Sequence, residues 1–72
     1  MIAKIRELRL TLRELGVEPR PGKGSHEIWV DTAAPHRRVV LSGNNGDDAP
    51  RYQAKRVRRF RHGTMLSRRE EE

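Results

Sequence analysis

Residues 23–30 constrain the fold more than any other stretch, because they join a glycine-rich turn to an alternating strand. Two glycines, Gly22 and Gly24, can adopt positive φ, so the backbone can reverse sharply here and approach a ligand closely. His26 follows at the expected start of the strand. A side chain at that position is held firmly and still meets solvent, so the turn and His26 together form a candidate site.

The strand is indicated by the alternation of side chains over residues 26–30. His26, Ile28 and Val30 fall on one face, and Glu27 and Trp29 fall on the other. We expect Ile28 and Val30 to point into the core. Trp29 would then stand on the open face of the sheet, where an aromatic side chain suits contact with a base or with a partner protein.

Two amphipathic helices are expected on either side of this region. In residues 2–15, apolar side chains recur at spacings of three and four, and Gly16 stands where a C-terminal cap is expected. The arginines of this segment are interpreted as a solvated face: they are Arg6, Arg9 and Arg13. A second helix should begin near Pro50 and end at Gly63, which leaves residues 64–72 as a flexible tail.

The remaining segments predict two further strands. Residues 17–20 form a short extended segment, which Pro19 and Pro21 confine to a sheet edge because proline has no ladder donor. Residues 38–42 return from a turn as the last strand. The order helix, strand, strand, strand, helix predicts a two-layer α+β fold, a three-stranded antiparallel sheet with both helices on one face. A chain of this length makes one domain, which we place at residues 1–63.

The charge of the chain indicates the class of its partner. Sixteen Lys and Arg stand against ten Asp and Glu, and three of the acids form the terminal run 70–72. A field this positive favours polyanions, with nucleic acid first and an acidic membrane surface or acidic protein after it. The absence of cysteine excludes disulfides, thiolate nucleophiles and Cys-based zinc sites.

Apolar runs are short and interrupted by charge, which argues against a transmembrane helix or a signal peptide. We therefore expect a cytoplasmic protein with no membrane partner.

Several short motifs occur in a characteristic order: residues 12–16 at a helix end, Arg20, Lys23-Gly24-Ser25-His26, Ile28 with Trp29, and Arg38-Val39. In this order, and in a basic chain of this length, they resemble the HicA-type toxins of bacterial toxin–antitoxin pairs. These are small RNA-cleaving proteins with a fold similar to double-stranded RNA-binding domains. The resemblance covers about residues 8–60.

The resemblance implies that His26 takes part in cleaving mRNA during translation or stress, and that a cognate antitoxin covers His26 and the basic face. Two positions depart from the family. Val17 replaces an aromatic residue after the helix-ending glycine. The family's Pro-x-His after the last strand is Ser42-Gly43-Asn44 here, which removes a possible second functional group.

The chemistry of the residues is compatible with that role. RNA contains its own nucleophile, the 2′-hydroxyl. A ribonuclease therefore needs a base to deprotonate this hydroxyl, an acid to protonate the leaving oxygen, and a positively charged group in contact with the phosphate. Histidine titrates near neutrality and serves as either acid or base. Lys23 and the N–H groups of the turn are placed to hold a phosphate. The full set of candidate RNA contacts is Lys23, Gly24, Ser25, Arg20, Arg38, Arg56 and Arg59.

No second acid or base is evident, because His36 falls in a turn on the far side of the hairpin and His62 near a helix end. No carboxylate cluster suggests a metal, so cleavage would be metal-independent and would need no cofactor. The chain would be a monomer when free. Two alternatives stay open: a non-catalytic RNA-binding module of the same fold, and a small ribosome- or protein-associated factor whose charge keeps it soluble.

Overall fold

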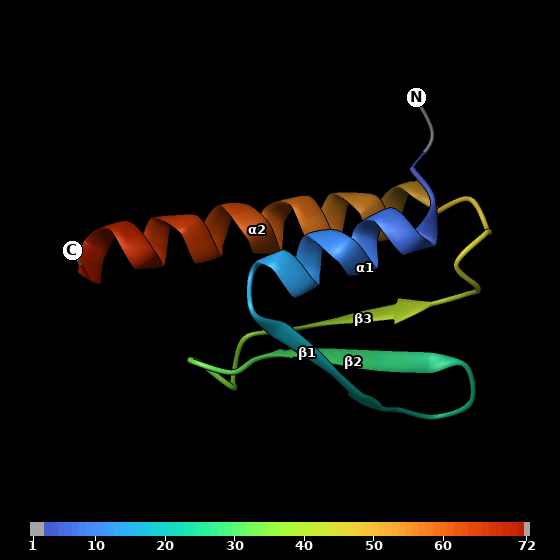
Figure 1. Ribbon diagram of the computed structural model, residues 1–72, viewed down its shortest axis with the longest axis horizontal. Helices are drawn as coiled ribbons and strands as arrows, with labels where there is room; N and C mark the ends of the chain where they lie inside the picture. Colours follow the sequence, from blue (N-terminus) through green and yellow to red (C-terminus); the bar gives the residue numbers. More distant parts are fainter. Residues whose placement is uncertain (1–2, 72) are drawn as a thin grey trace.

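The computed structural model describes residues 3–71, with side chains described for residues 3–67. The elements in chain order are α1 (Ile5–Glu14), β1 (Val17–Pro21), β2 (His26–Asp31), β3 (Arg38–Ser42) and α2 (Arg51–Glu71). The strands form one antiparallel sheet in the order β1-β2-β3, and both helices lie on the same side of it (Figure 1). The predicted two-layer α+β fold is confirmed.

The faces of β2 are largely the reverse of those expected, although Val30 is buried as predicted. Trp29 is completely buried and belongs to the core cluster between the sheet and the helices. Ile28 is only half-buried and lies opposite Arg20 and Val40, on the face away from the helices. The prediction that Trp29 stands on the open face as a partner contact is therefore wrong.

The register of β3 explains this reversal. Val39 lies opposite Trp29, and Leu41 lies opposite Glu27, so the buried side chains of β3 share a face with the odd-numbered residues of β2. An indole buries more apolar area than an isoleucine or a valine side chain does. Burying Trp29 therefore gains more free energy than is lost by leaving Ile28 on the outer face.

α1 begins at Ile5, later than the predicted start; Ile2 lies outside the described residues. Its first N–H groups are bound by the loop between β3 and α2: the Ile5 and Arg6 N–H groups donate to the carbonyls of Asp47 and Asn45 at 2.9 and 3.2 Å. The helix ends as predicted, since Gly16 takes the positive φ of 79° that favours glycine there.

α2 does not end at Gly63 but continues to Glu71, so residues 64–71 are helical. Gly63 has a packing role instead. A Cβ at this position would lie 2.8 Å from Nη2 of Arg37. That nitrogen donates to the Phe60 carbonyl at 2.9 Å, and the Arg37 Cζ lies 4.7 Å from the centroid of the Phe60 ring. The glycine makes room for a guanidinium against the helix.

No helix in the described part of the chain is long and apolar enough to cross a bilayer.

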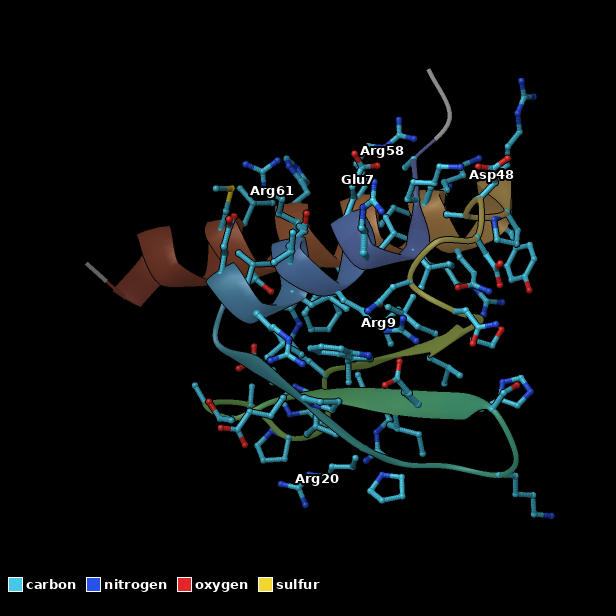
Figure 2. The ribbon with its side chains drawn as sticks, turned by 45° about the vertical axis from the view of Figure 1, so that its right-hand side comes forward. Glu7, Arg9, Arg20, Asp48, Arg58 and Arg61 are labelled. Carbon is cyan, nitrogen blue, oxygen red and sulfur yellow. The ribbon has the colours of Figure 1, made fainter. Side chains whose placement is uncertain are left out.

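Arg9, interpreted above as a solvated side chain, instead joins three segments (Figure 2). Its Nε and Nη2 lie 2.8 and 2.7 Å from Oε1 of Glu27, which is on the helix-facing side of β2. Nη2 also donates to the Gly43 carbonyl at 2.7 Å, and Nη1 donates to the side chain of Asn45. The Glu27 carboxylate is half-buried and faces the core, where an unpaired charge would be unfavourable. The ion pair with Arg9 provides the required partner.

Arg9→Ala is expected to lower the free energy of unfolding by about 2 kcal/mol, because it leaves Glu27 and the Gly43 carbonyl without their donors. Urea unfolding followed by Trp29 fluorescence measures the change. The control is Arg6→Ala, an exposed arginine of the same helix, for which we expect a change within about 0.5 kcal/mol. Equal effects of the two substitutions would show that the Arg9 contacts add no stability.

Candidate nucleic-acid interface

The β1–β2 turn holds His26 at one end of the sheet with its side chain exposed. The His26 N–H donates to the Lys23 carbonyl at 3.1 Å, and the His26 carbonyl accepts from the Gly22 N–H at 3.1 Å. Gly24 has φ +61°, the positive value that a type II′ turn requires at its second position. At Gly22, a Cβ would lie 2.8 Å from the His26 carbonyl oxygen. Both glycines are thus required, and the backbone of His26 is fixed from both sides.

The same turn offers free backbone donors. Within the described residues, the N–H groups of Lys23, Gly24 and Ser25 have no hydrogen-bond acceptor. Successive N–H groups in a tight turn form a concavity that suits an anion. Lys23 is exposed and belongs to the same turn, so its positive charge and these N–H groups can together attract a phosphate near His26.

Three of the predicted RNA contacts come together elsewhere. Arg38 of β3 and Arg56 and Arg59 of α2 line one groove, whose other lining residues are Val39, Val40 and Phe60. All three arginines are exposed. The remaining predicted contact, Arg20, lies opposite Ile28 and points away from the helices (Figure 2). The predicted residues therefore form a turn group, a groove group and an isolated arginine.

An aromatic side chain adjoins the groove group. The Arg56 Cζ lies 5.5 Å from the centroid of the Tyr52 ring, and Tyr52 is 57% exposed. A guanidinium at this distance is attracted by the ring and loses some of its freedom. The pair offers a cation for a phosphate and a ring face for a base.

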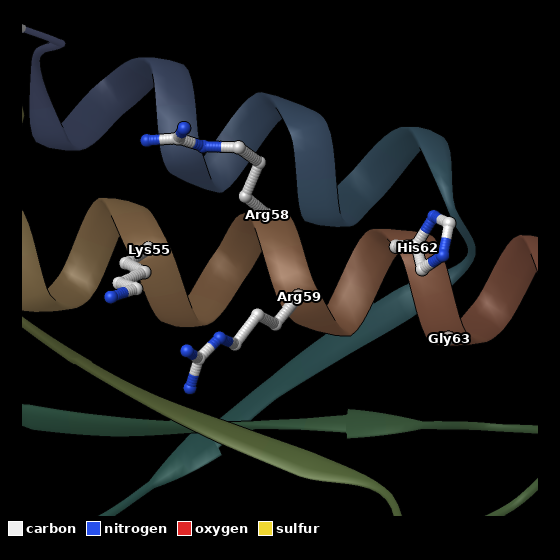
Figure 3. A pocket seen from close by; sticks show the side chains of 5 residues that line it. All are labelled: Lys55, Arg58, Arg59, His62 and Gly63. Atoms are coloured by element: carbon white, nitrogen blue, oxygen red, sulfur yellow. The ribbon is translucent and has the colours of Figure 1, made fainter.

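Further cations on α2 surround a shallow hollow at the surface (Figure 3). Its lining residues are Lys55, Arg58, Arg59, His62 and Gly63. Arg58 and Arg59 leave the helix in opposite directions, toward α1 and toward the strands. Lys55, Arg58 and His62 were not among the site residues predicted from the sequence. Their spacing of three and four residues was the available signal, since it puts side chains on one helix face.

The positive charge of α2 is not neutralised within the described part of the chain. The two ion pairs found there, Lys4 with Asp48 and Arg9 with Glu27, use no side chain of α2. From residue 51 to residue 67 the helix has no Asp or Glu. Its exposed arginines and lysine are Arg51, Lys55, Arg56, Arg58, Arg59 and Arg61. This surface has the charge that sequence-independent phosphate binding needs.

Ser42 connects the turn to α2. It is the register partner of His26 in the sheet. Its Oγ accepts from Nε2 of Gln53 at 3.0 Å, and Gln53 follows Tyr52 in the first turn of α2. The backbone of His26 therefore lies at the end of the sheet where α2 begins, while its side chain is on the outer face of β2 that it shares with Ile28.

No second histidine lies beside His26. His36 follows the opposite end of β2, and His62 lies far along α2. At Asn44, the backbone N–H donates to Oδ2 of Asp47 at 2.9 Å as part of the loop structure. No group of three or more His, Asp or Glu side chains among the described residues is placed to hold a metal ion.

No protein-family model matches this sequence, and no curated protein matches it significantly. The resemblance to HicA-type toxins therefore rests on the motifs and their order alone.

Proposed function

We propose that this protein is a HicA-type toxin, a metal-independent endoribonuclease that cleaves mRNA in the cytoplasm and is neutralised by a cognate antitoxin. One observation carries the proposal: an exposed histidine stands in a fixed turn with three unused N–H groups, at the end of the sheet where the basic surface of α2 begins. A histidine, phosphate donors and a cationic surface are the groups that RNA cleavage through the 2′-hydroxyl requires.

Each group has a defined task in this mechanism. The cations of α2 bind the RNA backbone and hold it across the domain. The Lys23 ammonium and the turn N–H groups bind the phosphate at which cleavage occurs. His26 takes the proton of the 2′-hydroxyl, or gives a proton to the leaving 5′-oxygen. With one proton-transfer group, water serves at the other position, so we expect slow cleavage.

A non-catalytic RNA-binding module is the second candidate. The observation that favours it is the lack of a second histidine near His26, with Asn44 standing where the family has one. In that case the same cations bind RNA and His26 acts only as a polar contact.

Incubation with RNA and with DNA of the same sequence, both in EDTA, distinguishes the two candidates. We expect wild-type protein, folded and free of antitoxin, to fragment the RNA and leave the DNA intact. RNA that stays intact while binding with a steep salt dependence would favour the second candidate. Absence of both binding and cleavage would rule out both.

The double variant Arg56→Glu/Arg59→Glu is expected to weaken RNA binding at low salt about 10- to 100-fold, because each change replaces a phosphate contact with a repelling charge. The slope of log affinity against log salt should also become shallower by about two. Fluorescence anisotropy of a labelled RNA measures both quantities.

The control is Arg6→Glu/Arg13→Glu, which makes the same change of net charge on α1. Because the Arg13 Cζ lies 5.6 Å from the Trp29 ring, circular dichroism first checks that this variant is folded. We expect it to weaken binding less than about tenfold, since it acts through the overall field only. If both double variants weaken binding equally, RNA does not bind at the groove formed by β3 and α2.

A further inference from the structure

β3 is an unprotected edge of the sheet. The strand order places β1 and β3 at the two edges. β1 contains Pro19 and Pro21, which have no N–H group, so its edge offers fewer donors. β3 contains no proline. A strand edge of this kind can pair with another extended chain.

The register shows which backbone groups of β3 are free. The Asp31 N–H donates to the Arg37 carbonyl at 3.0 Å, and in an antiparallel pair every second residue bonds to the partner strand. Val39 and Leu41 therefore bond to β2. The N–H and carbonyl groups of Arg38, Val40 and Ser42 face the free edge.

The end of this edge is already occupied. Oε1 of Gln53 accepts from the Ser42 N–H, and Nε2 of Gln53 donates to the Ser42 carbonyl, both at 3.4 Å. The side-chain amide thus pairs with Ser42 as the backbone of a neighbouring strand would. Within the described residues, the outward groups of Arg38 and Val40 have no such partner.

The surface beside these free groups is the groove between β3 and α2. Its lining combines the apolar side chains of Val39, Val40 and Phe60 with three arginines. Val40 is 39% exposed. An extended segment placed along the edge would bury apolar side chains on Val40 and meet positive charge on α2.

We propose that β3 binds an extended acidic segment of a partner protein as an added strand. Backbone groups of the segment pair with Arg38 and Val40, and its carboxylates contact Arg38, Arg56 and Arg59. A second copy of this chain is disfavoured, since edge pairing of two β3 strands would bring the arginines of both copies together. The same arginines are proposed above to bind RNA, so the segment and RNA would compete for this groove. Only the segment can also pair with the alternating backbone donors and acceptors of β3.

Amide hydrogen exchange tests this pairing without any reference to RNA cleavage, so either proposal can fail alone. The probe is a blocked octapeptide that alternates Glu and Val. We expect it to slow exchange of the Arg38 and Val40 amides at least about tenfold at saturation, as a hydrogen-bonded edge requires. The matched peptide, in which every Val is Pro, has the same charge but loses half its donors and disfavours the strand conformation; it should leave both amides unprotected.

Three outcomes would overturn the proposal. Equal protection by the two peptides would show that charge alone drives binding. Protection by a short oligouridylate and not by the Glu-Val peptide would assign the groove to nucleic acid alone. Lack of protection by any probe at millimolar concentration would show that the edge has no ligand of this class.

Two variants locate the binding. Val40→Pro removes an outward N–H without removing a bond to β2, and it should weaken binding of the Glu-Val peptide at least about tenfold. Arg56→Glu/Arg59→Glu leaves the β3 backbone unchanged and should weaken it by a similar factor through charge. Circular dichroism checks that each variant is folded. Wild-type peptide affinity in the folded charge variant would contradict the proposed site.

Discussion

Replacing Trp29 with alanine is expected to remove about 3–5 kcal/mol from the free energy of unfolding. A chain of this length has a total stability of roughly 4–11 kcal/mol, so the substitution would remove a large share of it. The reason is the position of the indole: it is completely buried between the sheet and the helices, opposite Val39 and below Arg13, whose Cζ lies 5.6 Å from the ring. Alanine would leave a cavity that this small core cannot close.

Far-UV circular dichroism during urea unfolding measures this loss, since the variant has no tryptophan left to report it. The control is Ile28→Ala, the neighbouring position on the outer face, for which we expect a loss of about 1 kcal/mol. A larger effect at Ile28 than at Trp29 would contradict the observed orientation of β2.

Trp29→Phe adds a finer comparison. The buried Nε1 of Trp29 has no hydrogen-bond partner among the described residues. Phenylalanine removes this unsatisfied donor and keeps most of the apolar area, so it should destabilise far less than alanine does.

Replacing His26 with alanine is expected to reduce the rate of RNA cleavage by about 10²–10⁴-fold, the usual contribution of one proton-transfer group. RNA affinity should change by less than about threefold, because the cations proposed to bind the backbone remain in place. The separation of the two effects is the signature of a catalytic role. A loss of affinity that accounts for the loss of rate would indicate a binding role instead.

His36→Ala is the matched control for this experiment. His36 is also an exposed histidine, but it follows the opposite end of β2 and contacts no residue of the turn group. We expect its cleavage rate to equal that of the wild-type protein. Equal losses at His26 and His36 would show that neither histidine is specific to the reaction.

The sequence predicted the elements and their order because these depend on local patterns. The alternation over residues 26–30 identified β2, and it correctly grouped His26, Ile28 and Val30 on one face. It could not decide which face is inside, since both carry large apolar side chains. That choice depends on the register with β3, where Val39 and Leu41 lie opposite Trp29 and Glu27, and register is a non-local property.

The other corrections have the same physical origin. Glycine is typical of a helix end, but Gly63 lies inside α2, where it leaves space for the Arg37 side chain from a distant part of the chain. Arg9 has the spacing of a surface residue, but Glu27 and the loop at Gly43 make it structural. In each case a long side chain from a distant segment decides the outcome.

The sequence predicted which residues belong to the candidate site better than it predicted how they are arranged in space. Net charge and residue type identified Arg38, Arg56 and Arg59 separately, and only the fold brings them to one groove. The turn at His26 was identified as a unit because it is contiguous in sequence. The turn is linked to α2 through Ser42, the register partner of His26, which is hydrogen-bonded to Gln53. No sequence pattern indicated this contact.

Cleavage of an RNA and of its fully 2′-O-methylated counterpart, both in EDTA, tests whether His26 acts on the 2′-hydroxyl. If His26 acts on the 2′-hydroxyl, wild-type protein cuts the RNA to fragments with 2′,3′-cyclic phosphate ends and leaves the methylated strand intact. The His26→Ala variant cuts neither at a comparable rate. Cleavage of the methylated strand, or equal cleavage of RNA by both proteins, would show that His26 does not act on the 2′-hydroxyl.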